Sequence, residues 1–168
     1  MSGVRVIKFD REAGTAQPGG EELLDQLGGS EKAWLWVDIS GAPSGEKDRI
    51  LRELFEIPQL AIQDANRSRH PPKLEHIGDN EFLMLRDIVE ADGDERAVVK
   101  QLSFFIGLNF MITVHAEDSP SVEKAWAEAL TNRDLAARGP AHLTYRLTRN
   151  IVDAYTPIVL GHEEALAE

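Results

Sequence analysis

Apolar and polar positions change their spacing several times along the chain, and each change marks an expected element. Residues 4–9 alternate between apolar and polar, and residues 33–39 are aromatic and β-branched, which is the composition of a buried strand. Between them, the glycine- and proline-rich residues 13–20 predict a loop, and residues 21–27 predict a short helix. The first part of the chain therefore predicts two strands separated by a loop and a short helix.

Two short helices are expected next. Ser44 is a favoured capping residue with acidic residues after it, and Pro58 fits the first turn of a helix. The apolar residues that follow each start fall on one helix face: Ile50, Leu51, Leu54 and Phe55 in the first helix, and Leu60, Ala61 and Ala65 in the second.

The spacing returns to period two after Pro71 and Pro72. Four further strands are predicted, at residues 73–77, 82–89, 97–106 and 110–115. The dipeptide Asp92-Gly93 lies between the second and third of these and is a strong hairpin signal.

Two amphipathic helices complete the pattern. Ser119-Pro120 caps the first, and we expect its apolar stripe, with Trp126 at the centre, to lie buried against the sheet. The stripe consists of Val122, Ala125, Trp126, Ala129 and Leu130. Gly139-Pro140 begins the last helix, whose apolar positions Leu143, Leu147 and Ile151 are each four residues apart, and whose pattern continues to Glu168.

This mixture of helices and strands predicts an α/β fold with a mixed parallel and antiparallel sheet flanked by helices. We divide the chain into a mixed α/β domain at residues 1–138 and the beginning of a helical region at residues 139–168.

Composition narrows the function classes. The 168 residues include no cysteine, which removes disulfides and thiolate metal sites and fits a reducing cytosol. The net charge is −11, so no basic face is large enough to favour nucleic acid as a partner. The most apolar stretch, residues 102–114, is shorter than the roughly 20 residues that a membrane span requires and contains Gly107 and Asn109.

Candidate chemistry is sparse. The five histidines (His70, His76, His115, His142 and His162) have no metal-ligand spacing, and we interpret them as surface or strand-end residues. The acids near the hairpin, Asp87, Glu90, Asp92, Asp94 and Glu95, are interpreted as solvated, and the three tryptophans as core. Arg67, Arg69, His70 and Lys73 are expected to pair with acids such as Asp64 and Glu75. No nucleophile lies beside an evident base, so we do not expect an enzyme and identify no catalytic residue.

Four segments together resemble the N-terminal cytoplasmic part of the CorA family of divalent-cation transporters. Residues 55–75, followed by 82–86, are similar to that family's short helix and Pro-Lys-Val-Glu-type strand, and 101–115 to its paired strands. Residues 147–160 resemble the start of its first long helix, and 36–39 add a weaker match.

The resemblance implies an αβα domain that forms the cytoplasmic funnel of a homopentameric magnesium channel, at the cytoplasmic face of the cell membrane. The membrane helices would follow Glu168, so the chain itself would be soluble, would not conduct ions, and would serve regulation and assembly. Its partners would be identical subunits and a divalent cation.

The resemblance also implies one candidate metal ligand. In magnesium-sensing members, an acidic pair on the short helix and an acid on the later helix hold regulatory cations between subunits. Here those positions are Gln63-Asp64 and Arg149, so only Asp64 matches. We expect at most a weak Mg²⁺ site at a subunit interface, and no other cofactor. The alternative role for Asp64 is as an ion-pair partner of Arg67 or as a cap on its own helix.

Two alternatives to the magnesium reading remain open. One is a zinc-type relative with the same fold that lacks magnesium sensing. The other is a free-standing α/β binding module or metal-dependent hydrolase.

Overall fold

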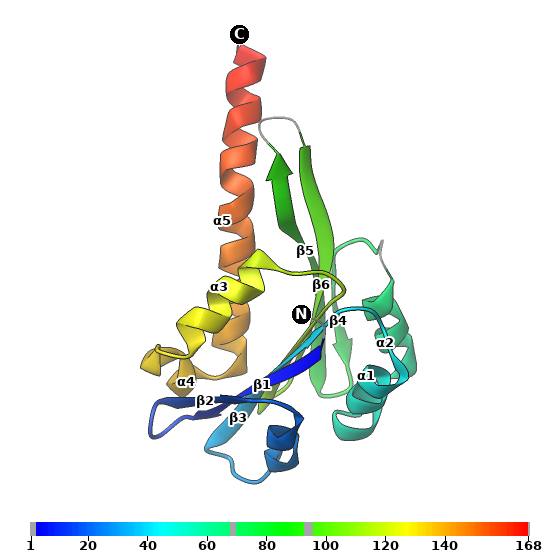
Figure 1. The fold of residues 1–168 in the computed structure, drawn as a ribbon, viewed down its shortest axis with the longest axis vertical. Coiled ribbons are helices and arrows are strands. Elements are labelled where there is room, and N and C mark those ends of the chain that lie inside the picture. Colours follow the sequence, from blue (N-terminus) through cyan, green and yellow to red (C-terminus); the bar gives the residue numbers. More distant parts are fainter. Residues whose placement is uncertain (1–2, 68–69, 93–95, 168) are drawn as a thin grey trace.

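The computed structural model describes residues 3–67, 70–92 and 96–167 and places seven strands of that range in one sheet (Figure 1). The strands are β1 Gly3–Asp10, β2 Thr15–Gly19, β3 Ala33–Ser40, β4 Lys73–Ile77, β5 Asn80–Asp92, β6 Arg96–Ile106 and β7 Phe110–His115. Their order across the sheet is β2-β1-β3-β7-β6-β5-β4. β3 and β7 run parallel, and every other pairing is antiparallel, so the expected mixed sheet is confirmed.

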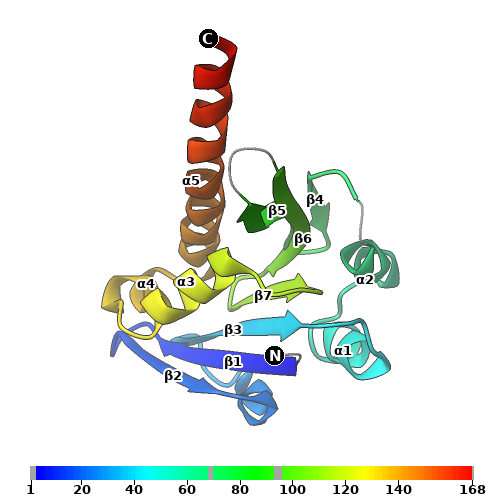
Figure 2. The same cartoon turned by 45° about the horizontal axis from the view of Figure 1, so that its top comes forward.

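Helices cover both faces of this sheet. They are the 3₁₀ helix η1 Glu21–Gln26, α1 Gly45–Arg49, the π-helical turn η2 Ile50–Leu54, α2 Gln59–Asn66, α3 Pro120–Ala129, α4 Arg133–Arg138 and α5 Pro140–Ala167. Ser44 and Ser119 accept hydrogen bonds from the backbone N–H groups of Lys47 and Val122, so both predicted caps are formed. Figure 2 shows α1 and α2 on one side of the sheet and α3, α4 and α5 on the other.

Each face has its own hydrophobic core. The first contains Leu35 and Val37 of β3 together with Ile50, Leu51 and Ile62 from the helical segments on that side. The second contains Trp34 and Trp36 of β3 together with residues of α3, α4 and α5 such as Val122, Leu135 and Leu143. Successive residues of β3 thus face opposite cores, which explains why this segment is apolar throughout.

Thr15–Gly19, which the sequence predicted as a loop, is an edge strand, β2, that pairs with β1 from Val6↔Gly19 to Asp10↔Thr15. The Asp10 carboxylate accepts hydrogen bonds from the Glu12 and Ala13 N–H groups, and Gly14 takes a positive φ of 66°, so the chain reverses tightly. Because β2 is at the edge, Pro18 can lie in it without removing an internal ladder bond.

Two other expectations need correction. Leu130 is 37% exposed, and Trp126, which packs against the second core, is only half-buried, so the α3 stripe is not buried along its whole width. Asp87 is 1% exposed rather than solvated. The hairpin turn at residues 93–95 and the side chains of Glu90, Asp92, Asp94 and Glu95 lie outside the described part of the chain.

α5 begins at Pro140, as expected, and continues through Pro157 to Ala167. Its first half packs on the sheet through Leu143, Leu147 and Ile151, and its second half extends away from the body (Figure 1). Within the described ranges, no helix has both the length and the apolarity that a membrane crossing requires.

Candidate functional site

Asp64, the expected metal ligand, lies in the last turn of α2 among cations. Its Oδ2 accepts a hydrogen bond from Lys73 Nζ at 2.7 Å, and its Oδ1 is 3.7 Å from Arg67 Nη1 and 4.0 Å from His70 Nε2. Lys73 also donates to Glu75 at 2.9 Å. The expected pairing of Arg67, His70 and Lys73 with neighbouring acids is therefore confirmed, while Arg69 lies outside the described residues.

The electrostatics of this cluster follow from the Asp64–Lys73 contact. The hydrogen bond from Lys73 lowers the pKa of Asp64, and the charges of Lys73, His70 and Arg67 lower it further. The same bond raises the pKa of Lys73. The Asp64 carboxylate is thus held as an anion whose charge is already balanced, and a metal ion must displace Lys73 to reach Oδ2.

The other two positions of the expected sensor do not join Asp64. Gln63 is exposed on α2. Arg149 lies on α5, on the opposite side of the sheet (Figure 1), and forms an exposed ion pair with Asp153 at 3.9 Å. No group of three or more His, Asp or Glu side chains within residues 3–67, 70–92 and 96–167 is arranged to hold a metal ion. Asp64 is therefore not joined by two further metal-ligating side chains of the described residues.

Replacing Lys73 with methionine is expected to raise the pKa of Asp64 toward its ordinary value, because the largest cause of the lowered pKa is removed. An NMR titration of the Asp64 carboxyl carbon measures this change. Arg49→Met, which removes an exposed cation of α1 that pairs with Glu53, is the matched control. An unchanged Asp64 pKa in Lys73→Met would contradict the assignment.

The strongest polar cluster is one that the sequence analysis missed, and it lies between β3 and β7. Asp38, 1% exposed, accepts hydrogen bonds from Thr113 Oγ1 at 2.6 Å, His115 Nε2 at 2.8 Å and Arg5 Nε at 2.8 Å. The parallel register pairs Asp38 with Thr113 and Ser40 with His115, so both β7 side chains reach the same carboxylate. A signal was present, since Asp38 interrupts an apolar strand and Thr113 and His115 share one face of the next, but the sequence did not reveal the register.

His115 has acceptors at both ring nitrogens. Its Nε2 faces Asp38, and its Nδ1 lies 2.6 Å from the backbone oxygen of Glu117. Only the imidazolium can donate at both positions. Burial alone lowers the pKa of His115, but the hydrogen bond to Asp38 and the Asp38 charge outweigh it, so the pKa is raised. Burial likewise raises the pKa of Asp38, but hydrogen bonds from His115 and Thr113 and the charges of His115 and Arg5 lower it overall.

A second buried carboxylate joins the sheet to α3. Asp87 of β5 accepts hydrogen bonds from Ser119 Oγ at 2.5 Å and from Ser121 Oγ at 2.6 Å. Ser119 is also the N-cap of α3, so Asp87 holds the start of this helix against β5. Asp38 and Asp87 thus each accept several hydrogen bonds. Asp38 links β3 to β1 and β7, and Asp87 links β5 to α3.

Comparison with known proteins gives the family. The model of the CorA-like Mg²⁺ transporter protein family matches residues 31–168. YfjQ of Bacillus subtilis (strain 168), a protein named for metal ion transport, is 30% identical over 136 residues, which cover 81% of this chain and 41% of YfjQ.

Solved structures share the fold. The soluble domain of CorA from Methanocaldococcus jannaschii matches with a TM-score of 0.73 at 18% identity, over 96% of this chain and 61% of that chain. The cytoplasmic domain of ZntB from Vibrio parahaemolyticus RIMD 2210633 matches with a TM-score of 0.68 at 15% identity, over 99% of this chain and 65% of that chain. This chain therefore spans less than half of YfjQ and about two thirds or less of each solved domain. The resemblance in the sequence is confirmed, and the chain belongs to the family of CorA-like Mg²⁺ transporter proteins.

Proposed function

We propose that this chain is the cytoplasmic regulatory and assembly domain of a divalent-cation transporter. The observation that carries the proposal is the family match across residues 31–168, which includes five of the seven strands, β3 to β7, and α5. The shared fold of the CorA soluble domain and the ZntB cytoplasmic domain supports it. The family is one of transporters, so it lends no support to the hydrolase alternative. The membrane-crossing part would come from sequence outside these residues, consistent with the greater length of YfjQ.

The second half of α5 supports a role in assembly. Val159, Leu160 and Leu166 are 53%, 52% and 87% exposed on this projecting segment. We propose that residues 139–168 begin a helical stalk and that identical subunits, five in the proposed complete transporter, cover these side chains. Isolated apolar surface side chains are ordinary, but several on one projecting helix favour a contact between subunits.

The transported ion can be magnesium or zinc within this proposal. A flux assay tests this proposal. The protein that contains this chain is placed in vesicles, and ion-sensitive dyes measure the entry of Mg²⁺ and Zn²⁺. Mg²⁺ flux would support the magnesium reading, and Zn²⁺ flux without Mg²⁺ flux would support the zinc-type alternative. Absence of flux of any divalent cation would contradict the proposed function.

Regulation by Mg²⁺ at Asp64 is expected to be weak. Mg²⁺ needs near-octahedral oxygen ligands, and Asp64 is a single carboxylate already bonded to Lys73. At a Mg²⁺ concentration one tenth of the dissociation constant, even five such sites would together stabilise the bound conformation by only about 0.3 kcal/mol. Millimolar MgCl₂ should therefore leave the melting temperature of this chain nearly unchanged, and equally so in Asp64→Ala. A marked rise that Asp64→Ala abolishes would show a working sensor.

A further inference from the structure

The buried histidine at the end of β7, His115, contacts two different parts of the chain at once. Its Nε2 lies 2.8 Å from Asp38 Oδ1 on β3, and its Nδ1 lies 2.6 Å from the backbone oxygen of Glu117. The first contact is internal to the sheet. The second holds residues 116–118, which lead from β7 toward α3, against the ring. One imidazole therefore joins the end of the sheet to this connecting segment.

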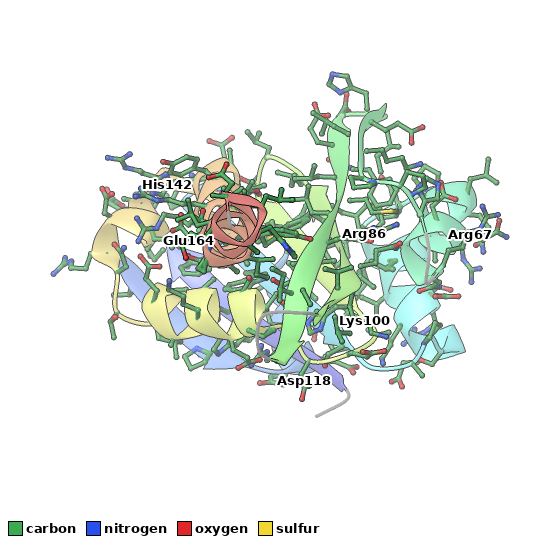
Figure 3. The ribbon with its side chains drawn as sticks, turned by 90° about the horizontal axis from the view of Figure 1, so that it is seen from above. Arg67, Arg86, Lys100, Asp118, His142 and Glu164 are labelled. Carbon is green, nitrogen blue, oxygen red and sulfur yellow. The ribbon has the colours of Figure 1, made fainter. Side chains whose placement is uncertain are left out.

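Charged side chains surround the ring and the connecting segment. They are Arg5 of β1, Asp38 of β3, Lys100 of β6, Glu117 and Asp118 of the segment itself, and Glu123 of α3. Arg5 bridges Asp38 and Glu123, and Lys100 pairs with Glu117 at 2.9 Å. Figure 3 shows Lys100 and Asp118 on the same side of the molecule, near the start of α3. Four acids thus face two cations, so these surroundings favour a positive charge on the ring.

A cavity of about 440 Å³ lies beside the ring. His115 and Asp38 line it from the sheet, and Asp118 and Glu123 line it from the connecting segment and α3. His115 is only 5% exposed, so this cavity is the route by which protons reach the ring. The same cavity gives the connecting segment room to move.

Loss of a proton leaves the His115 ring with one N–H group for two acceptors. The charge-assisted hydrogen bond to the Asp38 carboxylate is the stronger of the two, so the remaining proton stays on Nε2. Nδ1 then presents a lone pair to the Glu117 oxygen at 2.6 Å, and two acceptors this close repel each other. The contact with the connecting segment is therefore the one that opens.

The elements on either side of the segment are anchored independently of the ring. The Gly41 N–H donates to the His115 backbone oxygen at 3.0 Å, which holds the end of β7. Asp87 accepts hydrogen bonds from the Ser119 and Ser121 hydroxyls, which holds the start of α3. Movement is thus confined to residues 116–118, between these two anchors.

We propose that His115 is a proton-controlled latch, in which the protonated ring holds residues 116–118 against the sheet and the neutral ring releases them. The pKa of His115 is raised above 6.5, so the latch is closed below pH 6.5 and opens as the pH rises through the folded pKa. This inference does not depend on the proposed transport function, since it rests only on the contacts of the ring.

An NMR pH titration of the whole chain tests the latch. As the pH rises through the folded pKa of His115, we expect its Nδ1 to lose the proton while Nε2 keeps it, which the ring ¹⁵N signals report. The backbone amide signals of residues 116–118 should shift with the same midpoint. The indole signal of Trp34, which donates to the Ala136 backbone oxygen on the far side of the same core, is the internal reference and should not follow this midpoint.

Variants separate the latch from a general effect of pH. Asp38→Asn removes the negative charge beside Nε2 and should lower the midpoint by roughly 1–3 pH units, with the signals of residues 116–118 following it. His115→Gln should abolish the transition at residues 116–118. His76→Gln, which removes an exposed histidine paired with Glu81, should leave the transition as in wild type.

Three results would overturn the inference. They are a His115 ring that keeps both protons up to the pH at which the chain unfolds, loss of the proton from Nε2 instead of Nδ1, and signals of residues 116–118 that do not follow the ring. A transition at residues 116–118 that persists in His115→Gln would do the same. The wild-type titration decides the matter by itself if a variant does not fold.

Discussion

Replacing Asp38 with alanine is expected to lower the free energy of unfolding by about 3 kcal/mol, since removing one partner from a buried ion pair leaves the other uncompensated. Asp38 is 1% exposed and accepts hydrogen bonds from Arg5, Thr113 and His115. Its loss leaves the buried His115 Nε2 without its carboxylate. Urea unfolding followed by circular dichroism measures the change.

The same network should make stability depend on pH. The pKa of His115 is raised above 6.5, so its contribution is complete below pH 6.5 and is lost as the pH rises through its folded pKa. The pKa of Asp38 is lowered below 3.8, so its contribution is complete above pH 3.8 and is lost as the pH falls through its folded pKa. The network therefore stabilises the chain most between these two values.

One variant tests the pH dependence, and a second is the control for the loss of stability in Asp38→Ala. His115→Gln should flatten the fall in unfolding free energy that we expect in wild type as the pH rises above 6.5 and through the folded pKa of His115. Asp134→Ala, which breaks an exposed pair with Arg138, should cost at most about 1 kcal/mol. A loss in Asp38→Ala no larger than in Asp134→Ala would show that the buried network contributes little to stability.

Replacing Trp34 with alanine is the second large expected effect, a loss of about 3–5 kcal/mol in unfolding free energy. Trp34 is 1% exposed, stacks on Phe9 with ring centroids 4.0 Å apart, and donates from Nε1 to the Ala136 backbone oxygen at 2.9 Å. The substitution leaves a cavity between β1, β3 and α4 and an unbonded carbonyl. Denaturant unfolding measures the loss.

Trp126→Ala is the matched comparison and should cost less, about 2 kcal/mol, because this side chain is only half-buried. The ring centroids of Trp126 and Trp36 are 5.0 Å apart, and the Arg5 guanidinium lies 4.1 Å from the Trp126 ring centroid. A loss from Trp126→Ala equal to that from Trp34→Ala would mean that this half-buried side chain contributes as much to stability as the fully buried one.

Local spacing determined most of the elements. The period-two segments became β1, β4, β5, β6 and β7, the aromatic and β-branched segment became β3, and the predicted serines cap α1 and α3. These signals depend on neighbours a few residues apart. β2 escaped prediction because its glycine and proline residues favour a loop, and only the backbone of β1 beside it makes it a strand. α4 escaped because six residues are too few for a period to show.

The candidate sites differ in whether their residues are close together in the sequence. The sequence supplied Asp64 with its nearby cations, since Arg67, His70 and Lys73 lie within nine residues of it. Asp38 and His115 are 77 residues apart, and only the parallel register of β3 and β7 joins them. Composition and spacing determine which residues are buried or exposed locally, whereas strand order and register decide which distant side chains meet, because that depends on packing across the whole sheet.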